Sequence, residues 1–297
     1  MQDVLIKGLL CADAVRLSAI SGQELCEAAR MTHGLSRVCT AALGRTLLMT
    51  AMMGADLKSG HDKVTAIIKG GGPAGNIVCT GNSAGAVKGY IENPALELPL
   101  GPDGKLDVSS AVGWYGALTV LRDMGLKEPY TGRCAMVSGE IAEDFAQYFT
   151  SSEQQPSLVY LGVRVDSQTG KVRAGGGLLL QPLPHCPEET LDRLQAKAEG
   201  IQRLAAMLEE GLPLKDALSA LFDGMDLRIV DELRPAFCCD CNRERLEKVL
   251  ISLGREELRD MIEQEHGAEL TCHFCNTIYR FDEAQLRALL REAVSGV

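Results

Sequence analysis

Five of the eleven cysteines lie close together near the C-terminal end of the chain. Cys239 and Cys241 are separated by one residue, and Cys272 and Cys275, which follow after a spacer of 30 residues, are separated by two. Two such pairs can chelate one ion, and four thiolates in a tetrahedron are a common ligand set of structural Zn²⁺, with Zn–S distances of about 2.3 Å. The spacing therefore predicts one zinc ion bound by Cys239, Cys241, Cys272 and Cys275.

Two simpler interpretations compete with a functional zinc site. Free cysteine behaves as a small hydrophobic residue, but the polar neighbours Asp240, Asn242 and His273 disfavour an ordinary core position. A static zinc site is the stronger alternative. Closing a Cys-x-Cys pair into a disulfide makes a small strained ring, and strained disulfides tend to be labile or regulatory. The spacing favours a redox-sensitive site and leaves a purely structural one open.

Other candidate sites are weaker. The glycine-rich segment from Gly70 to Gly75 resembles a phosphate-binding loop, but no Lys-Ser/Thr pair follows it and the next residues are typical of a strand. We therefore expect a turn. Ser151 and Ser152 have no nearby histidine that could activate them, which disfavours a hydrolase.

Composition places the chain among globular proteins. It has 297 residues, of which 46% are hydrophobic and 24% charged, enough for about one to three domains. The most apolar run, from Thr46 to Leu57, is too short to span a bilayer, and the N-terminus lacks the features of a signal peptide. We expect a cytoplasmic protein with no membrane partner, whose cysteines are normally reduced.

Negative charge is concentrated in the cysteine-bearing third of the chain. Residues 187–297 hold 14 Lys and Arg against 23 Asp and Glu, whereas residues 1–186 hold 16 against 17. Zinc modules that grip phosphate backbones need a basic face. The sequence therefore disfavours nucleic acid as a partner.

Alternating and helical patterns predict an α+β domain over residues 1–183. We expect two strands within residues 3–20, a helix that begins with a capping box at Ser21–Glu24 and ends at His33, and a buried helix over 36–57. Glycine-punctuated strands follow at 64–68, 76–80, 86–91, 113–122 and 130–137. A helix over 139–149 and a hairpin of strands at 158–166 and 172–181 complete this mixed-sheet domain.

Prolines at 182, 184 and 187 mark a boundary, after which the pattern predicts a helical linker over residues 184–235. Apolar residues recur at helical spacing over 191–210 and again over 214–222, and we expect this stripe to lie against the N-terminal domain.

The remaining residues, 236–297, are predicted to form a small C-terminal zinc-binding lobe. Its expected helices are two short ones broken at Gly254 and a last one capped by Asp282. A lobe of this size has little apolar core. Zinc binding contributes about 10–16 kcal/mol in zinc-finger peptides, so we expect metal loss to unfold the lobe.

The chain as a whole resembles the redox-regulated 33 kDa chaperonin, or bacterial heat-shock protein 33, family. The cysteine spacing carries the resemblance, together with His33 and blocks that follow the order of the family. These blocks are Ala42-Leu43-Gly44-Arg45, Gly72-Pro73-Ala74-Gly75, Lys88-Gly89-Tyr90, Tyr130-Thr131-Gly132 and Ser152-Glu153-Gln154-Gln155-Pro156-Ser157.

This resemblance implies a non-enzymatic, ATP-independent holding chaperone that responds to oxidative stress. The reduced, zinc-bound form would be inactive. Oxidation would form the disulfides Cys239–Cys241 and Cys272–Cys275, release zinc, and activate the chaperone toward unfolded or oxidatively damaged proteins. Our own hypothesis is that the linker helices, around Leu191 to Phe222, then lose their support and expose the apolar stripes that hold these clients. The family also implies a homodimer in the oxidised state.

Some residues depart from the family pattern, and two other functions stay open. Cys238 is an additional cysteine beside the first pair, and six more lie outside the motif: Cys11, Cys26, Cys39, Cys79, Cys134 and Cys186. One alternative is a constitutive structural zinc module that mediates protein interactions without redox switching. The other is a dithiol oxidoreductase, which would need an exposed Cys-x-x-Cys at a helix N-terminus.

Overall fold

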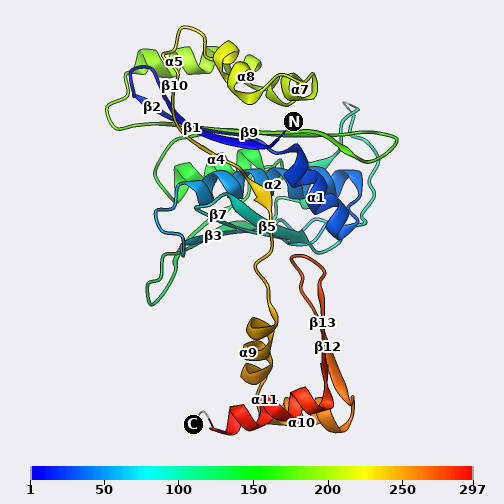
Figure 1. Cartoon of the computed structure of the whole chain (residues 1–297). Coiled ribbons are helices and arrows are strands. Elements are labelled where there is room, and N and C mark those ends of the chain that lie inside the picture. The colour runs from blue at the N-terminus through cyan, green and yellow to red at the C-terminus, as the bar shows by residue number, and fades with distance from the viewer. Residues whose placement is uncertain (1, 103, 296–297) are drawn as a thin grey trace. The chain divides into compact units, whose positions relative to one another are not determined.

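The computed structural model describes residues 2–102 and 104–295 of the chain (Figure 1). It divides into two compact units, Met1–Cys238 and Cys239–Val297. The first unit contains two β-sheets with helices packed against them, and the second is a small α+β unit that carries the four cysteines. The predicted α+β class is confirmed.

A five-stranded antiparallel sheet forms one layer of the first unit, in the order β10-β1-β2-β9-β8. Its strands are β1 (Val4–Leu10), β2 (Val15–Ser21), β8 (Leu158–Val165), β9 (Val172–Pro182) and β10 (Arg228–Leu233). The predicted β1–β2 and β8–β9 hairpins are both present. β10 was not predicted, because its sequence carries no alternation and five of its six residues are exposed beside β1.

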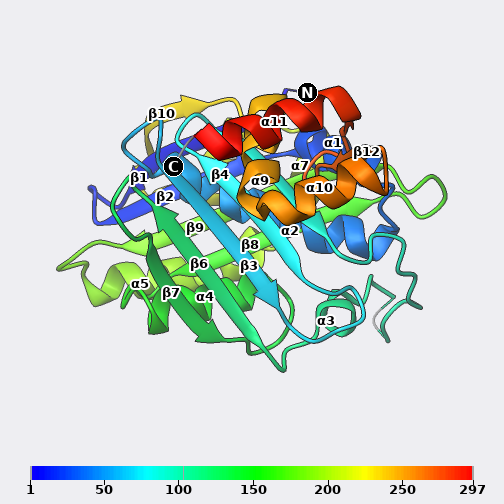
Figure 2. The same cartoon turned by 90° about the horizontal axis from the view of Figure 1, so that it is seen from below.

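A six-stranded sheet forms the second layer, in the order β11-β5-β4-β3-β6-β7 (Figure 2). Its strands are β3 (Lys63–Lys69), β4 (Ile77–Asn82), β5 (Ala86–Ile91), β6 (Ala117–Asp123), β7 (Tyr130–Ala135) and the short β11 (Ala236–Phe237). Side chains of β3, β4 and β5 alternate between buried and partly exposed. The strands themselves were predicted from the glycine-rich turns that separate them.

The helix α2 (Arg37–Ala55) connects the two layers by its contacts with strands of both sheets. It is long and apolar enough to cross a membrane by length and composition alone, and 94% of that stretch is buried inside the fold. Ser36 caps its first turn by accepting a hydrogen bond from the Cys39 N–H at 3.2 Å. As predicted, α2 is a buried core helix. Two shorter helices, α3 (Val108–Val112) and α4 (Ala142–Ser151), also pack in this unit.

The capping box predicted at Ser21–Glu24 is wrong. Helix α1 (Gln23–His33) begins after Gly22 without a side-chain cap of its own. The Ser21 hydroxyl is instead paired with the backbone of Val4, the residue opposite it in the β1–β2 ladder. The carboxylate of Asp3 takes over as the cap and accepts from the N–H groups of Glu24 at 3.2 Å and Leu25 at 2.7 Å. The other end of α1 is as predicted, with Gly34 at φ 60°.

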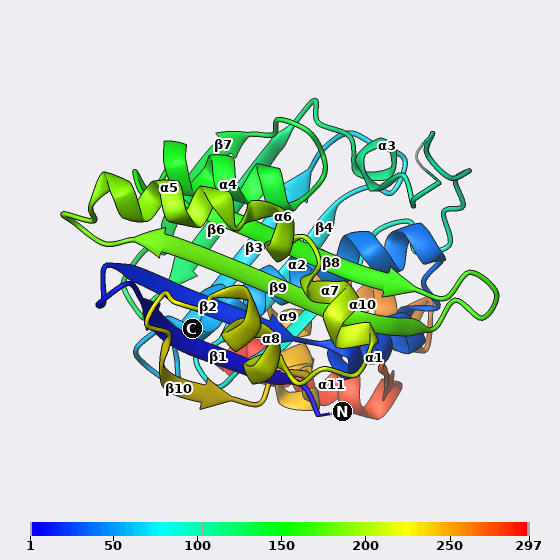
Figure 3. The same cartoon turned by 90° about the horizontal axis from the view of Figure 1, so that it is seen from above.

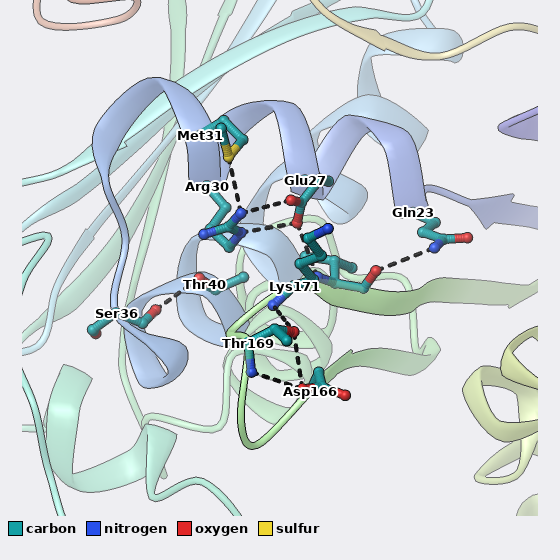
Figure 4. Close-up of polar contacts among 10 residues, drawn as sticks. Gln23, Glu27, Arg30, Met31, Ser36, Thr40, Asp166, Thr169 and Lys171 are labelled. Atoms are coloured by element: carbon teal, nitrogen blue, oxygen red, sulfur yellow. Dashed lines mark hydrogen bonds and ion pairs between the residues drawn. The ribbon is translucent and has the colours of Figure 1, made fainter.

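Side chains of α1 also hold the β8–β9 hairpin (Figure 4). Gln23 donates to the carbonyl of Val172 at 3.1 Å, and the N–H of Val172 donates to Glu27 at 2.9 Å. Arg30 binds the same Glu27 carboxylate at 2.7 Å. At the hairpin turn, Asp166 accepts from the N–H of Thr169 at 2.8 Å. These bonds fix the register of β9 against the helix layer.

Four helices of residues 184–235 cover the outer face of the five-stranded sheet (Figure 3). They are α5 (Glu188–Ala196), α6 (Ala198–Ile201), α7 (Leu204–Glu209) and α8 (Leu214–Leu221). The single helix predicted over 191–210 is therefore wrong, since it is broken twice. The breaks fall at Lys197 and at Gln202–Arg203, on either side of the short α6. The stripe does lie against the N-terminal domain, because Leu194, Ile201 and Leu204 are buried with sheet residues.

The helical segment belongs to the first compact unit. The finer division into 1–183, 184–235 and 236–297 stays a prediction. We call the apolar contact between the helices and the sheet the segment interface. Its buried members include Ile6, Leu10, Leu17, Leu178, Leu180, Leu194, Ile201, Leu204, Leu214, Ala217 and Leu218.

The second unit has its own apolar core. Its elements are α9 (Arg243–Leu253), α10 (Arg255–Glu263), β12 (Gly267–Thr271), β13 (Ile278–Asp282) and α11 (Glu283–Ser295). As predicted, α9 and α10 are broken at Gly254, which has φ 101°, and Asp282 caps α11 by accepting from the Gln285 N–H at 2.8 Å. Its buried residues are Leu250, Leu258, Ile262, Phe281, Leu286 and Leu289. These six residues give the unit a core separate from that of the first unit.

Candidate metal centre

The four cysteines chosen from the sequence lie together in the second unit. Cys239 and Cys241 precede α9, and Cys272 and Cys275 lie in the turn between β12 and β13. All four sulfurs lie within 4.8 Å of one another, and all four residues are half-buried. Residues from two separate segments of the chain therefore converge on one point.

The β12–β13 turn places Cys272 and Cys275 on the same side. The N–H groups of Cys275 and Asn276 both donate to the Cys272 carbonyl, at 3.3 and 2.8 Å, and Cys272 itself donates to the Thr277 carbonyl at 3.0 Å. Asn276 has φ 56°, in the left-handed region that asparagine tolerates better than most residues. Cys272 thus lies in a strand-to-strand turn, as predicted, and not at a helix N-terminus as a thioredoxin-like dithiol would.

Polar residues order the chain around the first cysteine pair. Asn242 caps α9 by accepting from the Arg245 N–H at 2.9 Å. The Arg245 guanidinium in turn binds the Asp240 carboxylate at 2.8 Å and the Asp240 carbonyl at 3.3 Å. The residue between the two cysteines is therefore anchored to the helix that follows them.

Two hydroxyl groups on β13 and its turn contact the sulfurs. The Tyr279 hydroxyl lies 3.2 Å from Cys241 Sγ, and the Thr277 hydroxyl lies 3.2 Å from Cys275 Sγ. The sequence reasoning missed both residues. Their positions, two and four residues after Cys275, become meaningful only once the chain turns back as a hairpin and brings β13 beside the cluster.

The cluster changes the acidity of its members. Burial by itself would raise the pKa of Cys275, but hydrogen bonds from Thr277 and from the thiols of Cys241 and Cys272 outweigh it and lower the pKa to about 7. Burial raises the pKa of Cys272. The hydrogen bond to Cys241 raises the pKa of Tyr279 to about 12, so this phenol stays a hydrogen-bond donor. The site can therefore hold negative charge on sulfur near neutral pH.

The sulfur geometry fits a tetrahedral metal ion. Four sulfurs at about 2.3 Å from one ion would stand about 3.8 Å apart. The Cys239–Cys272 and Cys241–Cys275 sulfur pairs are separated by 3.8 and 3.4 Å. Thiolates are soft donors, which suit zinc, copper(I) or iron–sulfur chemistry rather than magnesium or calcium. Both the donor type and the spacing of the four residues fit a metal site.

The remaining cysteines lie apart from this cluster. None of the eleven cysteines, all of which lie in the described part of the chain, forms a disulfide. Cys238 is exposed and belongs to the first unit, where its N–H donates to the Val87 carbonyl at 2.9 Å. Cys26, Cys39, Cys79 and Cys134 are buried, whereas Cys11 and Cys186 are half-buried.

The weaker candidates of the sequence are accounted for by local structure. In the glycine-rich segment, the N–H groups of Gly72 and Ala74 donate to the carbonyls of Val112 and Ala111, both at 2.9 Å, and so are not turned toward a phosphate. The Ser151 hydroxyl donates to the Gln147 carbonyl at 2.8 Å and the Ser152 hydroxyl to the Arg133 carbonyl at 3.1 Å.

Comparison with known proteins agrees with this architecture. The family pattern described as "Hsp33 protein" matches residues 3–282. A "33 kDa chaperonin" of Alkaliphilus metalliredigens is 45% identical over 98% of this chain and 100% of its own length. Another of Clostridioides difficile is 41% identical over 98% of this chain and 100% of its own length.

A solved structure matches the whole fold as well. The crystal structure of the 33 kDa chaperonin (heat shock protein 33 homolog) from Thermotoga maritima aligns with a TM-score of 0.89 and 36% identity, and the alignment covers 99% of each chain. Family pattern, relatives and fold agree over nearly the entire length, and the four-cysteine cluster lies within the matched residues. The chain therefore belongs to the Hsp33 family of chaperonins.

Proposed function

We propose that this chain is a redox-regulated, ATP-independent holding chaperone. The observation that carries the proposal is the convergence of Cys239, Cys241, Cys272 and Cys275 within 4.8 Å in a chain that belongs to a chaperonin family. In its reduced form the protein is inactive as a chaperone, and in its oxidised form it binds unfolding proteins and prevents their aggregation.

Zn²⁺ is the metal we assign to the four thiols. Zinc takes four thiolates without a preference for planar geometry, and structural zinc sites are almost always tetrahedral. When bound, it would hold the sulfurs as thiolates and join the segment before α9 to the β12–β13 turn. Tyr279 and Thr277 would then donate hydrogen bonds to the ligand sulfurs, as outer residues of metal sites do.

Oxidation converts these ligands into disulfides. One peroxide takes two electrons from each cysteine pair, so that two thiols and one H₂O₂ give one disulfide and two waters. We assign the pairs Cys239–Cys241 and Cys272–Cys275. A sulfur in a disulfide is a poor metal ligand, and the ion is then lost from the site.

The helical segment of residues 184–235 is the part that we expect to bind clients. Its helices cover the five-stranded sheet through the segment interface, and their apolar residues would be exposed if they detached. If the second unit unfolds after oxidation, the chain that follows this segment is no longer ordered. The clients are unfolded or oxidatively damaged proteins, recognised by apolar surface rather than by sequence.

We place this activity in the cytoplasm, where peroxide or hypochlorite stress would convert a reduced protein into the active form. We expect the oxidised chain to form a homodimer and to have neither nucleic acid nor a membrane as a partner. It would hold clients without turning over a substrate, and so would not act as an enzyme.

One crosslink tests the role of the helical segment. Arg164 on β8 forms an ion pair with Glu209 on α7. In an Arg164→Lys variant, carbodiimide can join the new amine to Glu209 and fix α7 to the sheet by a bond that oxidants do not break. After oxidation, the crosslinked variant should lose its ability to suppress the aggregation of a model protein, and the same variant without carbodiimide should keep it. Full activity of the locked, oxidised protein would refute the role of the segment.

A constitutive zinc module is the second candidate, and the separate apolar core of the second unit favours it. A unit with six buried apolar residues could keep its fold and a permanent interaction role. The two functions differ in one experiment, which follows zinc release and suppression of aggregation together before and after mild peroxide. If zinc release and suppression of aggregation appear together after peroxide, the redox switch is supported. If zinc stays bound after peroxide, the static module is supported.

A further inference from the structure

Two cysteines outside the metal centre lie at the same end of the five-stranded sheet. Cys11 follows β1 and Cys186 follows β9, and both are half-buried. Both side chains also pack against the core of the segment interface. Because the other non-cluster cysteines of the first unit are either fully buried or, like Cys238, attached to the other sheet, these two form a distinct group.

The strand register brings the two positions together. In the β2–β9 ladder Val15 lies opposite Pro182, and the pairing continues by one step because the Leu183 N–H donates to the Ala14 carbonyl at 2.9 Å. From this last pair each chain makes one tight turn. The Ala14 N–H donates to the Cys11 carbonyl at 3.1 Å, and the Cys186 N–H donates to the Leu183 carbonyl at 3.0 Å.

Both cysteines therefore lie one turn beyond the same backbone pair. The ends of a β-turn are separated by less than about 7 Å, so each cysteine stays close to its end of the Ala14–Leu183 pair. Electrostatics agree with this placement. Burial raises the pKa of Cys11, the Arg193 guanidinium opposes this, and the neighbouring Cys186 and Asp226 raise the pKa further.

We propose that Cys11 and Cys186 are a second oxidation site, which closes to an intramolecular disulfide independently of the metal centre. The oxidant is a peroxide. Cys186 gives two electrons to H₂O₂ and becomes a sulfenic acid with release of one water. Cys11 then attacks that sulfur, and the S–S bond forms as a second water leaves. Both thiol protons end up in the waters.

The bond would tie the start of the helical segment to the sheet. Cys186 is the residue before Pro187, which precedes α5, and the Cys11 N–H already donates to the carbonyl of Met225, beyond the end of α8, at 2.7 Å. The β1–β2 turn is therefore bonded to the chain just after α8 and, through the Ala14–Leu183 pair, to the chain shortly before α5. In terms of the proposed function, on which this consequence alone depends, the disulfide would limit how far the segment detaches.

Peptide mapping of the intact, zinc-loaded protein tests the pair. Trypsin cleaves after Lys7 and Arg16 and after Arg173 and Arg193, so each cysteine falls in its own peptide with no other cysteine. After peroxide treatment and alkylation under non-reducing conditions, we expect peptide 8–16 joined to peptide 174–193, and its loss on reduction. A chromophoric zinc chelator followed in the same sample reports the metal centre separately.

Two variants sharpen the result. Cys186→Ser should leave Cys11 free for alkylation after the same treatment, whereas Cys238→Ser should give the linked peptide in unchanged yield. Absence of the linked peptide, with both thiols either still alkylated or oxidised singly to sulfinic acid, would overturn the proposal. Failure of the zinc switch would show in the chelator signal and would leave the linked peptide unaffected.

Discussion

At the scale of single residues, the buried acid Asp3 stands out. The residue is 6% exposed, and its carboxylate caps α1 by accepting from two backbone N–H groups. Burial raises its pKa from 3.8 to about 6, although the hydrogen bonds from Leu25 and Glu24 act in the opposite direction. The carboxyl group that caps α1 is therefore a buried group that resists ionisation.

The stability of the first unit should depend on pH through this residue. Because the folded pKa lies above the unfolded value of 3.8, the contribution of Asp3 is fully present below pH 3.8 and is lost as the pH rises through about 6. The loss amounts to roughly 3 kcal/mol on the scale of 1.36 kcal/mol per pKa unit. Asp3→Asn, which cannot ionise, should remove this slope from the urea midpoint followed by fluorescence of Trp114, the single tryptophan.

A surface aspartate provides the control for this prediction. The pKa of Asp166 is lowered, chiefly by hydrogen bonds from Thr169, so its contribution is present at higher pH and is lost as the pH falls through the lowered pKa. Asp166→Asn should therefore alter the pH profile in the opposite direction. An Asp3→Asn profile that runs parallel to the wild-type profile between about pH 4 and 7 would contradict the linkage argument.

Tyr279 should strengthen metal binding. Its hydroxyl lies 3.2 Å from Cys241 Sγ and can donate a hydrogen bond to the thiolate. Loss of an outer hydrogen bond typically weakens metal affinity 10–100-fold, and for Tyr279→Phe we expect a loss of about tenfold in a competition titration with a zinc chelator. Tyr115→Phe, at a position that is 89% exposed, is the matched control and should bind zinc like the wild type.

Sequence spacing was enough to choose the four cysteines, because chelation requires short spacers that are visible in one dimension. It could not identify Tyr279 as a neighbour of Cys241, since that contact depends on how β13 folds back beside the cluster. Asp3 was missed as the cap of α1 for the same reason. It is 21 residues away from the N–H of Glu24 and reaches it only through the pairing of β1 with β2.

At the scale of elements, the turn between β1 and β2 is strained. Cys11, Ala12 and Asp13 all have positive φ angles, of 54°, 53° and 68°. A non-glycine residue in this region costs roughly 1–2 kcal/mol. Tertiary contacts hold the turn in place, among them the two hydrogen bonds from the Arg228 guanidinium to the Asp13 carboxylate at 3.2 and 2.6 Å.

Glycine in this turn should stabilise the fold. Ala12→Gly relieves the left-handed strain, and after the entropy of the unfolded chain is counted we expect a gain of up to about 1 kcal/mol. Ala14 lies just outside the stretch of positive φ angles. Ala14→Gly should therefore destabilise the fold by a similar amount. Urea midpoints by Trp114 fluorescence measure both, and equal shifts in the same direction would refute the strain argument.

The segment interface should depend on its buried leucines. Leu204 is 0% exposed, whereas Leu191 in the same segment is 40% exposed. Leu204→Ala should weaken docking by about 2–5 kcal/mol, and Leu191→Ala should change it by less than about 0.5 kcal/mol. Hydrogen exchange of α5–α8 in the reduced protein reports docking directly. Unaltered exchange in Leu204→Ala would mean that the helices are held by something other than this apolar contact.

The elements that the sequence predicted well are those whose own pattern decides their structure. β3 alternates and α2 is apolar all round, and both appear where expected. The missed strand β10 is different, because five of its six residues are exposed and its extended form comes from pairing with β1. The helix predicted over 191–210 is broken at Lys197 and at Gln202–Arg203, where neither a proline nor a glycine marks the position.

At the scale of the whole molecule, the two units have separate cores and so should respond separately to metal removal. A structural zinc site contributes about 10–16 kcal/mol, which is more than the core of so small a unit is expected to supply. Chelation of the metal at neutral pH should therefore reduce the helical circular dichroism signal and the protection of α9–α11 amides from hydrogen exchange. The fluorescence of Trp114, in the first unit, should stay unaltered.

The control for chelation is re-addition of zinc, which should restore the protection of α9–α11. Persistent protection in the metal-free protein would show that Leu250, Phe281 and Leu286, with their neighbours, suffice to fold the unit. That outcome would favour the static module over the switch.

The helices over the five-stranded sheet begin after β9 and end before β10, and both strands belong to that sheet with only β2 and β1 between them. A stretch anchored in this way stays tethered when its middle comes loose. Docking of the helices back onto the sheet is then an intramolecular step. Its entropy cost rises by only about 0.6 kcal/mol per doubling of loop length. As long as β10 stays paired with β1, the rate at which the helical segment docks again on the sheet should not vary with protein concentration.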